Sequence, residues 1–296
     1  MSALKELTHT MWKNRRIIVA GGTSGFGLVL AKHLLAAGSL VLIVGRSSAG
    51  VRAALAACEG PAGRTDQPNG KMYGLSADLG QAGEGGRVVA ECVRLLGGVD
   101  DLFFCIGRSG RGLMLQTNVA ELRAFLEDNL ISAVEISQAV AHEETARRGH
   151  FVYIGSLAGK LVTPFMGPYC IAKSALAAFV AALRLEIAPG GAHVLLVSTG
   201  PIARNHDDPR SSDVPQSRYQ SDVKKNGLPA SAAAPGGSAK LRPLDPDRLA
   251  IAVLTACRRK QSELVVPRAA GLLAGLIEWF PGLGRRLLAR AANRRE

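Results

Sequence analysis

The stretch RIIVAGGTSGFGLVLAKHLLAAG, Arg16 to Gly38, decides the fold. It begins with a β-branched apolar run typical of a buried strand, passes through a glycine-rich turn and continues as a helical pattern. The glycines at 21, 25 and 27 have the spacing G-x-x-x-G-x-G. Such a turn lets the backbone approach a pyrophosphate, while the helix presents free N–H groups and its positive dipole end. The alternative is a turn that serves only helix–strand packing.

Further apolar segments of strand character follow along the chain, separated by helical patterns. They span residues 40–44, 71–75, 101–106, 150–155, 193–198 and 263–267. The main helical patterns are Phe26–Ala37, Gln81–Leu96, Val119–Arg147 and Tyr169–Ile187. Alternating strands and helices predict βαβ units with right-handed crossovers. We therefore expect an α/β fold, a single doubly wound domain whose parallel sheet of about seven strands carries helices on both faces.

Composition divides the chain into a central domain with two flanking segments. We expect an N-terminal segment at 1–15, the α/β domain at 16–267 and a C-terminal extension at 268–296. Within the domain, residues 205–246 are rich in Pro, Ser, Gly, Asp and Ala and show little periodicity. A loop of that length in a compact domain is usually a functional lid or disordered, so this insertion is a candidate substrate loop.

The net charge of +12 is concentrated toward the C-terminus. From residue 258 onward there are nine Lys and Arg against three Asp and Glu, which accounts for half of the excess. No basic run there is interleaved with aromatic residues, so nucleic-acid binding is not expected. A solvated basic tail and contact with an anionic membrane surface remain as alternatives.

The cysteines and the N-terminus indicate a cytoplasmic protein. The five cysteines form no CxxC pair and have no histidine at metal-ligand spacing, so we expect reduced thiols and no metal. HEETA, beginning at His142, lacks the second histidine of a zinc motif, and His206, Asp207 and Asp208 are expected to be solvated. The N-terminus has no apolar signal region, and no run is long enough to span a membrane.

The end of the second predicted strand favours NADP(H) over NAD(H) as cofactor. An acidic residue there would bond the ribose 2′-hydroxyl of NAD. This chain has Gly45-Arg46-Ser47-Ser48 instead, so no carboxylate repels a 2′-phosphate and Arg46 can pair with one. The alternative is that Arg46 is only a surface residue at a strand exit.

The stretch YCIAK places Tyr169 and Lys173 one helical turn apart on the same face. A tyrosine with a pKa near 10 gives up its proton reluctantly at neutral pH, and a nearby ammonium lowers that pKa. Ser156 would donate a hydrogen bond to a carbonyl oxygen as negative charge develops there. Asn129 would fix a helix distortion and a water that links Lys173 to solvent. Each residue alone is commonly structural, but the four together predict a proton relay for carbonyl reduction.

The glycine turn, ADL at Ala77–Leu79, Ser156 and YCIAK together resemble the short-chain dehydrogenase/reductase family, from about Arg16 to Pro267. The resemblance implies a Rossmann-like domain, an oxidoreductase that uses a nicotinamide cofactor, and a homodimer or homotetramer. It implies Asn129, Ser156, Tyr169 and Lys173 as the catalytic set. The residues it implies for cofactor binding are Gly21, Thr23, Ser24, Gly25, Phe26, Gly27, Arg46, Ser47, Asp78 at the adenine, Leu79, Gly107, Tyr169, Lys173, Gly200, Pro201 and Ile202.

The sequence departs from the family pattern at three places. Phe104-Cys105-Ile106-Gly107 replaces the N-N-A-G stretch, so both asparagines are absent. Thr199 replaces a proline, and Arg204 stands where the family often has threonine. Arg204 is open to three interpretations: contact with the cofactor phosphates, contact with an acidic substrate group, or exposure to solvent.

The expected function is hydride transfer between nicotinamide and a ketone or secondary alcohol, with Tyr169 as general acid and base. The apolar residues near it are Leu157, Leu161, Val162, Phe165 and Met166. They favour a lipophilic substrate such as a keto-lipid or a steroid-like ring. The alternative is that they serve only to pack the loop. The alternative is a non-catalytic NADP(H)-sensing protein. An epimerase or dehydratase on nucleotide sugars would need a longer C-terminal domain.

The C-terminal extension has apolar residues at helical spacing, followed by arginines. Its apolar residues are Leu272, Leu273, Leu276, Ile277 and Phe280, and its arginines include Arg285, Arg286, Arg290 and Arg294. One hypothesis is peripheral membrane contact through 269–296, with the arginines at anionic headgroups. The alternative is a helix that covers the active site or a neighbouring subunit.

Overall fold

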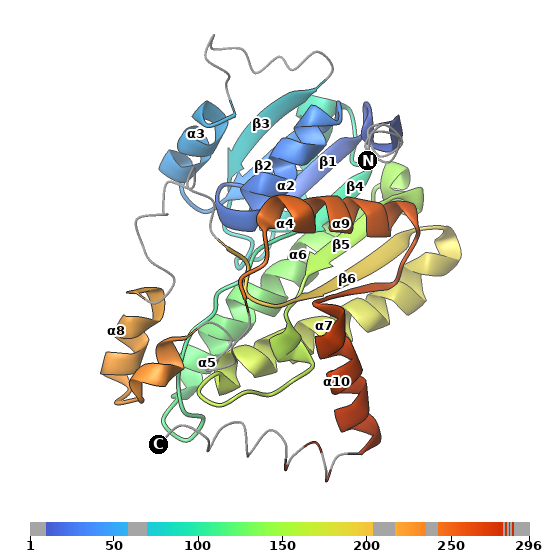
Figure 1. Cartoon of the computed structure of the whole chain (residues 1–296). Coiled ribbons are helices and arrows are strands. Elements are labelled where there is room, and N and C mark those ends of the chain that lie inside the picture. The colour runs from blue at the N-terminus through green and yellow to red at the C-terminus, as the bar shows by residue number, and fades with distance from the viewer. Residues whose placement is uncertain are drawn as a thin grey trace.

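A single parallel sheet organises the chain. The structure is a computed structural model that describes residues 10–58, 70–203, 217–234 and 242–280, together with 282, 284 and 286. Within these residues, seven strands pair in the order β3-β2-β1-β4-β5-β6-β7 (Figure 1). The strands are β1 Arg16–Ala20, β2 Leu40–Gly45, β3 Lys71–Ser76, β4 Asp101–Phe104, β5 His150–Ile154, β6 His193–Thr199 and β7 Glu263–Val266. The predicted doubly wound sheet is confirmed, and each predicted strand segment contains a strand.

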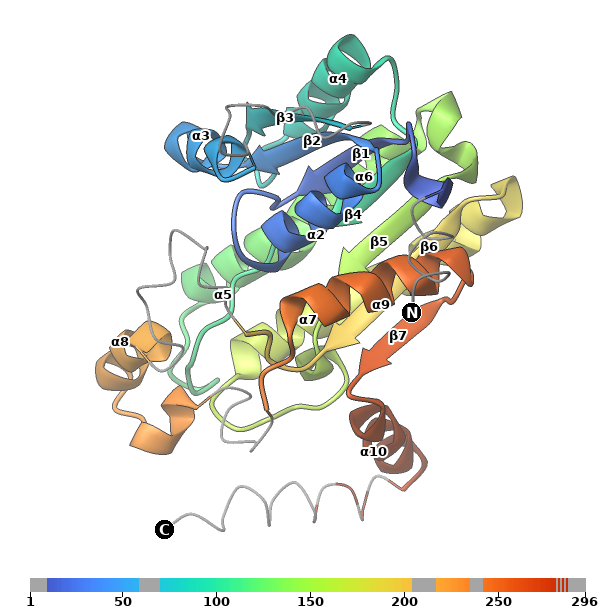
Figure 2. The same ribbon diagram turned by 45° about the horizontal axis from the view of Figure 1, so that its top comes forward.

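Helices cover both faces of the sheet (Figures 1 and 2). One face packs against α2 (Gly25–Ala36) and α9 (Pro246–Arg258), and the other against α4 (Glu84–Leu96), α6 (Ser132–Ala141) and α7 (Gly167–Ile187). The short helix α3 (Ser48–Ala56) follows β2. The side chains of β1 alternate between the two cores, Ile17 and Val19 facing one and Ile18 the other. Burial on both faces explains why its sequence is continuously apolar.

The long helical pattern 119–147 is interrupted in the structure. It forms α5 (Val119–Leu126), a π-helical turn (Glu127–Ile131), α6 and a 3-10 turn (Glu144–Arg148). Asn129 lies within the π turn, and its Nδ2 donates to the Phe125 carbonyl at 2.9 Å. An inserted side-chain bond of this kind distorts the regular backbone ladder. The prediction of one continuous helix is therefore wrong, while the distortion expected at Asn129 is present.

The described part of the predicted 205–246 loop contains regular structure. Residues 217–234 form α8 (Ser217–Lys225) and a 3-10 helix, η5 (Ala230–Ala233). The loop ends at Asp245, whose side chain caps α9 by accepting from Arg248 N. Arg204, His206, Asp207 and Asp208 lie outside the described residues.

The amino-terminal edge of the sheet is held together by buried polar groups. Trp12 is fully buried and stacks edge-on against Phe103. His150 and His193 begin β5 and β6, and their Nδ1 atoms lie 2.8 Å apart in a hydrogen bond. Cys257 completes a group whose potential ligand atoms lie within 4.8 Å of one another. Burial lowers the pKa of His150 to about 3. Both ring nitrogens of His193 are already hydrogen-bonded, to His150 Nδ1 and to Gln261 O at 2.8 Å, so we interpret this group as core packing.

The five cysteines are free thiols, and Cys92, Cys170 and Cys257 are buried. Burial raises the pKa of the Cys92 thiol to about 12. Inert thiols of this kind fit the expected reduced state. Among the described residues, no helix is both long and apolar enough to cross a membrane.

Candidate active site

The turn between β1 and α2 requires glycine for two separate reasons. Gly21 has φ +81°, and a Cβ there would lie 2.9 Å from Ile106 N. A Cβ on Gly27 would lie 2.1 Å from the Gly21 carbonyl oxygen. Helix α2 therefore sits directly against the turn, with its N-terminus at the carboxyl end of β1.

The start of α2 fits a bound pyrophosphate. Ser24 occupies the N-cap position without a side-chain capping bond, and the first turn contains no acidic residue. Phe26 is half-buried against the first core. Thr23 lies against the end of β2, because a Cβ on Gly45 would meet its side chain at 2.6 Å. A helix end without a carboxylate or a side-chain cap suits an anion.

Arg46 and Ser47 follow β2 at the same edge. The Arg46 side chain is 68% exposed and contacts Asp128 Oδ1 at 3.1 Å. The Ser47 side chain caps α3 by accepting from Gly50 N at 3.2 Å. An exposed ion pair of this kind contributes little stabilising free energy, so Arg46 could leave Asp128 and bind a phosphate instead.

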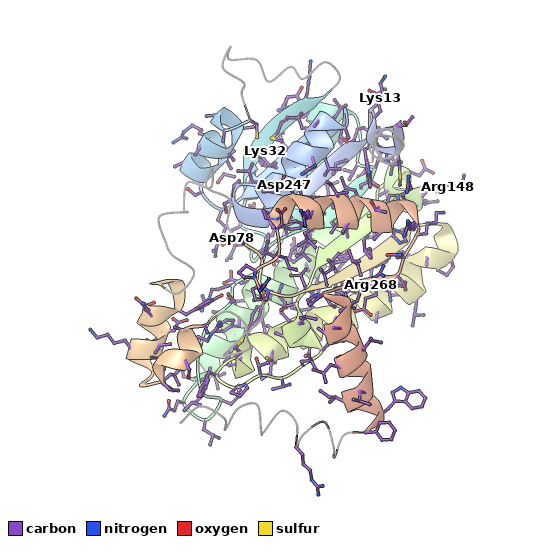
Figure 3. The ribbon with its side chains drawn as sticks, viewed as in Figure 1. Lys13, Lys32, Asp78, Arg148, Asp247 and Arg268 are labelled. Atoms are coloured by element: carbon purple, nitrogen blue, oxygen red, sulfur yellow. The ribbon has the colours of Figure 1, made fainter. Side chains whose placement is uncertain are left out.

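Asp78 and Leu79 follow β3, and Figure 3 labels Asp78 beyond the strand end. Asp78 is exposed, and its Oδ1 accepts from Gly80 N at 3.1 Å. Leu79 is 1% exposed and packs into the core behind β1 and β4. The buried Leu79 thus fixes the backbone next to Asp78, whose carboxylate stays exposed after β3.

Asn129, Lys173 and Gly107 meet behind β4. A Cβ on Gly107 would lie 2.9 Å from Lys173 Nζ and 3.0 Å from Asn129 Oδ1. Asn129 is fully buried; its Nδ2 donates to Arg108 O at 3.0 Å, and its Oδ1 has no hydrogen-bond partner among the described residues. A glycine at 107 is what leaves room for these two polar atoms to share one space.

Lys173 is a buried ammonium on the first turns of α7. Its Nζ donates to the Ile154 carbonyl at 3.3 Å, which ties α7 to the end of β5. Burial lowers the pKa of Lys173 to about 8, and the nearby Cys105 opposes that shift. The charged form therefore still predominates at neutral pH.

Ser156 and Tyr169 lie on the two segments that flank this lysine. Ser156 begins the 3-10 turn Leu157–Gly159, and its Oγ accepts from Ala158 N at 3.1 Å. Ala158 shares a small apolar cluster with Met166 and Cys170, against which Tyr169 packs. The structure thus brings the four predicted side chains to the carboxyl ends of β4 and β5.

The segment after β6 forms a bridge with the chain before α9. Ala203 N donates to Leu244 O at 2.8 Å, and Leu244 N donates to Pro201 O at 2.7 Å. This parallel bridge uses the carbonyl of Pro201 and the N–H of Ala203, the residues on either side of Ile202. The N–H and C=O of Ile202 itself therefore point away from Leu244. Gly200 is bonded to Val266 O, so the segment continues along β7.

The apolar residues predicted near the site divide into two groups. Leu157, Leu161 and Met166 are buried, as the packing alternative requires. Val162 is exposed, and Phe165 is half-buried with φ +62°. The loop before α7 therefore offers fewer apolar side chains to a ligand than its sequence suggested.

Sequence reasoning did not predict the contacts of the 217–234 segment. This segment lies against the loop that follows β4, where Ser109 Oγ and Tyr219 Oη are 2.7 Å apart. Arg111, in the same loop, is 3% exposed. An arginine placed so soon after a buried strand was the one available hint, because buried arginines need several partners.

Comparison with known proteins identifies the family of the chain. The short chain dehydrogenase family model matches residues 15–214. The dehydrogenase/reductase SDR family member 7B of Bos taurus is 28% identical over 287 residues, which cover 95% of this chain and 82% of that protein. Its counterpart in Xenopus tropicalis is 32% identical over 190 residues, and the match covers 64% of this chain and 61% of the relative.

A more distant relative and a solved structure agree with this result. The hydroxysteroid 11-beta-dehydrogenase 1-like protein of Danio rerio is 27% identical over 60% of this chain and 59% of its own length. A short-chain dehydrogenase from Streptomyces avermitilis has the same fold, with a TM-score of 0.69 and 24% identity over 92% of this chain and 98% of that one. The chain belongs to the short-chain dehydrogenase/reductase family and is an NAD(P)-dependent oxidoreductase.

Proposed function

We propose that the protein is an NADP(H)-dependent oxidoreductase acting between a ketone and a secondary alcohol. The observation that carries this proposal is that Lys173 Nζ, one helical turn from Tyr169, and Asn129 Oδ1 both lie next to Gly107, and that Asn129 Oδ1 has no hydrogen-bond partner in the described part of the chain. A buried ammonium near a phenol favours the phenolate and so helps the phenol to transfer its proton.

A nicotinamide cofactor bound at this site would supply the hydride. Tyr169 donates its hydroxyl proton to the carbonyl oxygen, and Ser156 donates a hydrogen bond to the same oxygen as it becomes negative. The Lys173 ammonium favours the resulting phenolate, which lowers the barrier to losing the proton.

Reprotonation of Tyr169 requires a path to solvent, and we assign it to Lys173 and Asn129. Asn129 Oδ1 is an acceptor without a protein partner within the described residues, and it faces the space next to the ammonium. A buried acceptor of this kind is normally satisfied by a water. Such a water would accept a proton from solvent and return it through Lys173.

The preference for NADP(H) rests on Arg46, and its removal should reverse the preference. Arg46→Ser should weaken NADPH binding by roughly tenfold or more and leave NADH binding within about twofold, because a charge-assisted bond contributes about 1.5–3 kcal/mol. Fluorescence titration with both cofactors measures this change.

Arg52→Ser is the matched control. Arg52 is exposed on α3, and its replacement by serine removes the same charge as Arg46→Ser does. Asp128→Asn should strengthen NADPH binding slightly by releasing Arg46. If Arg46→Ser weakens NADPH and NADH equally, or Arg52→Ser has the same effect, Arg46 does not read the 2′-phosphate.

For the substrate we propose a lipophilic carbonyl compound. The exposed Val162 and the half-buried Phe165 lie in the loop before α7. The name of one relative, a hydroxysteroid 11-beta-dehydrogenase 1-like protein, agrees with an apolar alcohol or ketone. NADPH oxidation across long-chain keto-lipids, ketosteroids and small ketones tests the proposal, which fails if small polar ketones are preferred.

We also propose peripheral contact with an anionic membrane surface through α10 (Arg268–Trp279). Figures 1 and 2 show α10 projecting from the carboxyl edge of the sheet, and Figure 3 labels Arg268 at its start. Trp279 is 82% exposed, and the other exposed apolar residues are Leu272, Leu273, Leu276 and Phe280. An apolar face next to basic residues suits a lipid interface. Arg285, Arg290 and Arg294 lie outside the described residues.

Leu276→Asp should reduce sedimentation with phosphatidylserine-containing liposomes by about tenfold, since it puts a charge on the apolar face. Ile251→Asp on α9 is the matched control, with 39% exposure against 42% for Leu276. The particle mass is measured on the same samples. If Leu276→Asp changes the mass and the wild type does not bind liposomes, α10 contacts a neighbouring subunit instead.

For the oligomer we propose pairing through α5, α6 and α7. These helices and the π turn between them expose large apolar side chains that a partner would cover: Val119, Ile131, Ile171 and Leu185. We retain the division into 1–15, 16–267 and 268–296 as a proposal for the domain organisation, and a cytoplasmic location as the expected one.

A further inference from the structure

Arg111 lies between the two halves of the 217–234 segment. On one side, α8 and the residue that follows it hold the backbone of Arg111: Arg111 N donates to Asp222 Oδ2 at 3.0 Å, and Asn226 Nδ2 donates to Arg111 O at 2.9 Å. On the other side, its guanidinium reaches η5, where Nε donates to Ala232 O at 2.7 Å and Nη2 donates to Ala234 O at 3.1 Å. One residue of the β4 loop thus binds both parts of a segment more than a hundred positions away.

The guanidinium is buried without a carboxylate partner among the described residues. It is 3% exposed, and the face of Tyr219 lies 3.7 Å from Arg111 Cζ. Its Nη1 donates to its own loop at Gly110 O. The carbonyls of Ala232 and Ala234 are at the C-terminal end of η5, where helix carbonyls carry partial negative charge. The cation is stabilised by carbonyl oxygens and an aromatic ring.

The same loop contacts the chain just before Tyr169. Gly112 N donates to Phe165 O at 2.9 Å, and Gly112 bridges Met166. A Cβ on Gly167 would meet the Met114 side chain at 2.5 Å, so the two loops are in close contact. The charge of Arg111 also interacts with Tyr169 and with Asp222. Arg111 is therefore a neighbour of the proposed proton donor as well as of the 217–234 segment.

We propose that Arg111 is a positioning residue that fixes the 217–234 segment beside Tyr169 and so determines how the substrate is held. Figures 1 and 2 place α8 at the carboxyl edge of the sheet, on the flank opposite α10. The planar guanidinium forms bonds in three directions and stacks on Tyr219 at the same time. Lysine has a single ammonium and no planar face, so it cannot reproduce this set. The proposal for substrate affinity rests on the proposed function, whereas the docking of the segment does not.

Arg111→Lys should loosen the segment without disturbing the cofactor. Amide hydrogen exchange in peptides from 217–234 should become at least about tenfold faster, while peptides from β4 and α7 keep their rates. KM for the carbonyl substrate should rise about tenfold or more, with kcat within about threefold and the NADPH dissociation constant unchanged. Arg123→Lys on α5 is the matched control.

A second variant keeps the test independent of the stability of Arg111→Lys. Tyr219→Leu removes the stacked ring and the contact with Ser109, and it should give the same exchange and KM changes. The double variant should be less than additive, because both residues act through one contact. The proposal would be overturned if Arg111→Lys left amide exchange in 217–234 unchanged. It would also be overturned if kcat fell by the same factor as KM rose, or if the affinity for NADPH became weaker. If the wild type reduces no carbonyl compound, the proposed function is wrong, and the exchange data alone decide the role of Arg111.

Discussion

Tyr169→Phe should lower kcat/KM for carbonyl reduction by roughly a hundredfold to ten-thousandfold, the usual contribution of a positioned general acid. The substitution removes one oxygen and leaves the ring in its cluster with Ala158, Met166 and Cys170. Lys173 and Asn129 keep their positions, so NADPH should bind with unchanged affinity. Steady-state kinetics with the best substrate of the panel, together with a cofactor titration, measure both quantities.

Tyr153→Phe is the matched control for that loss. Tyr153 is a fully buried tyrosine of β5, and its hydroxyl lies 2.6 Å from Ser137 Oγ. Removing its hydroxyl should cost about 1 kcal/mol of unfolding free energy and leave kcat near the wild-type value. A Tyr169→Phe variant that keeps more than about a tenth of wild-type kcat would show that another group supplies the proton.

Gly27→Ala should abolish tight cofactor binding. The new Cβ would lie 2.1 Å from the Gly21 carbonyl oxygen, a backbone atom of the turn that is proposed to hold the pyrophosphate. To relieve the contact, α2 must move away from β1, which displaces the N–H groups at its start. We expect the NADPH dissociation constant to rise by at least about a hundredfold and the free energy of unfolding to fall by about 1–3 kcal/mol. Fluorescence titration and urea unfolding measure the two effects.

Gly86→Ala separates this contact from the general effect of replacing a helical glycine. Gly86 lies within α4, and outside the helix's own backbone no atom of the described residues stands within 4 Å of the position its Cβ would take. This variant should be more stable than wild type by about 0.5–1 kcal/mol, because alanine favours the helix. If Gly27→Ala binds NADPH as tightly as wild type does, the cofactor does not need the close approach of α2 to the turn.

The repeating pattern of the sequence was sufficient to predict the sheet. Strands such as β1 and β6 are buried on both faces, so their apolar runs are visible without any knowledge of their neighbours. The position of Lys173 relative to Tyr169 was also predictable, because helical geometry relates residues four apart. Both features depend on short-range periodicity, which a single sequence records.

The division of the 119–147 pattern into separate helices and the structure within 217–234 were harder to foresee. The π turn depends on a side-chain bond from Asn129 to Phe125 O, which competes with the regular backbone bonds of a helix. Helix α8 is mostly polar, and the side chains of its Tyr219 and Asp222 bond to Ser109 and Arg111 in the distant β4 loop. A helix that is stabilised by distant contacts has a weak local signal.

By itself, the sequence determined the succession of strands and helices and the glycine turn, because periodicity and spacing act over a few residues. Its resemblance to the family indicated the four residues proposed for proton transfer. Only the tertiary structure decided that Gly107 leaves room for Lys173 Nζ beside Asn129 Oδ1, and that Arg111 is buried between α8 and η5. These contacts join residues as many as 121 positions apart. Their formation depends on how the sheet and its loops pack in space, and packing of that range leaves no repeating pattern in a single chain.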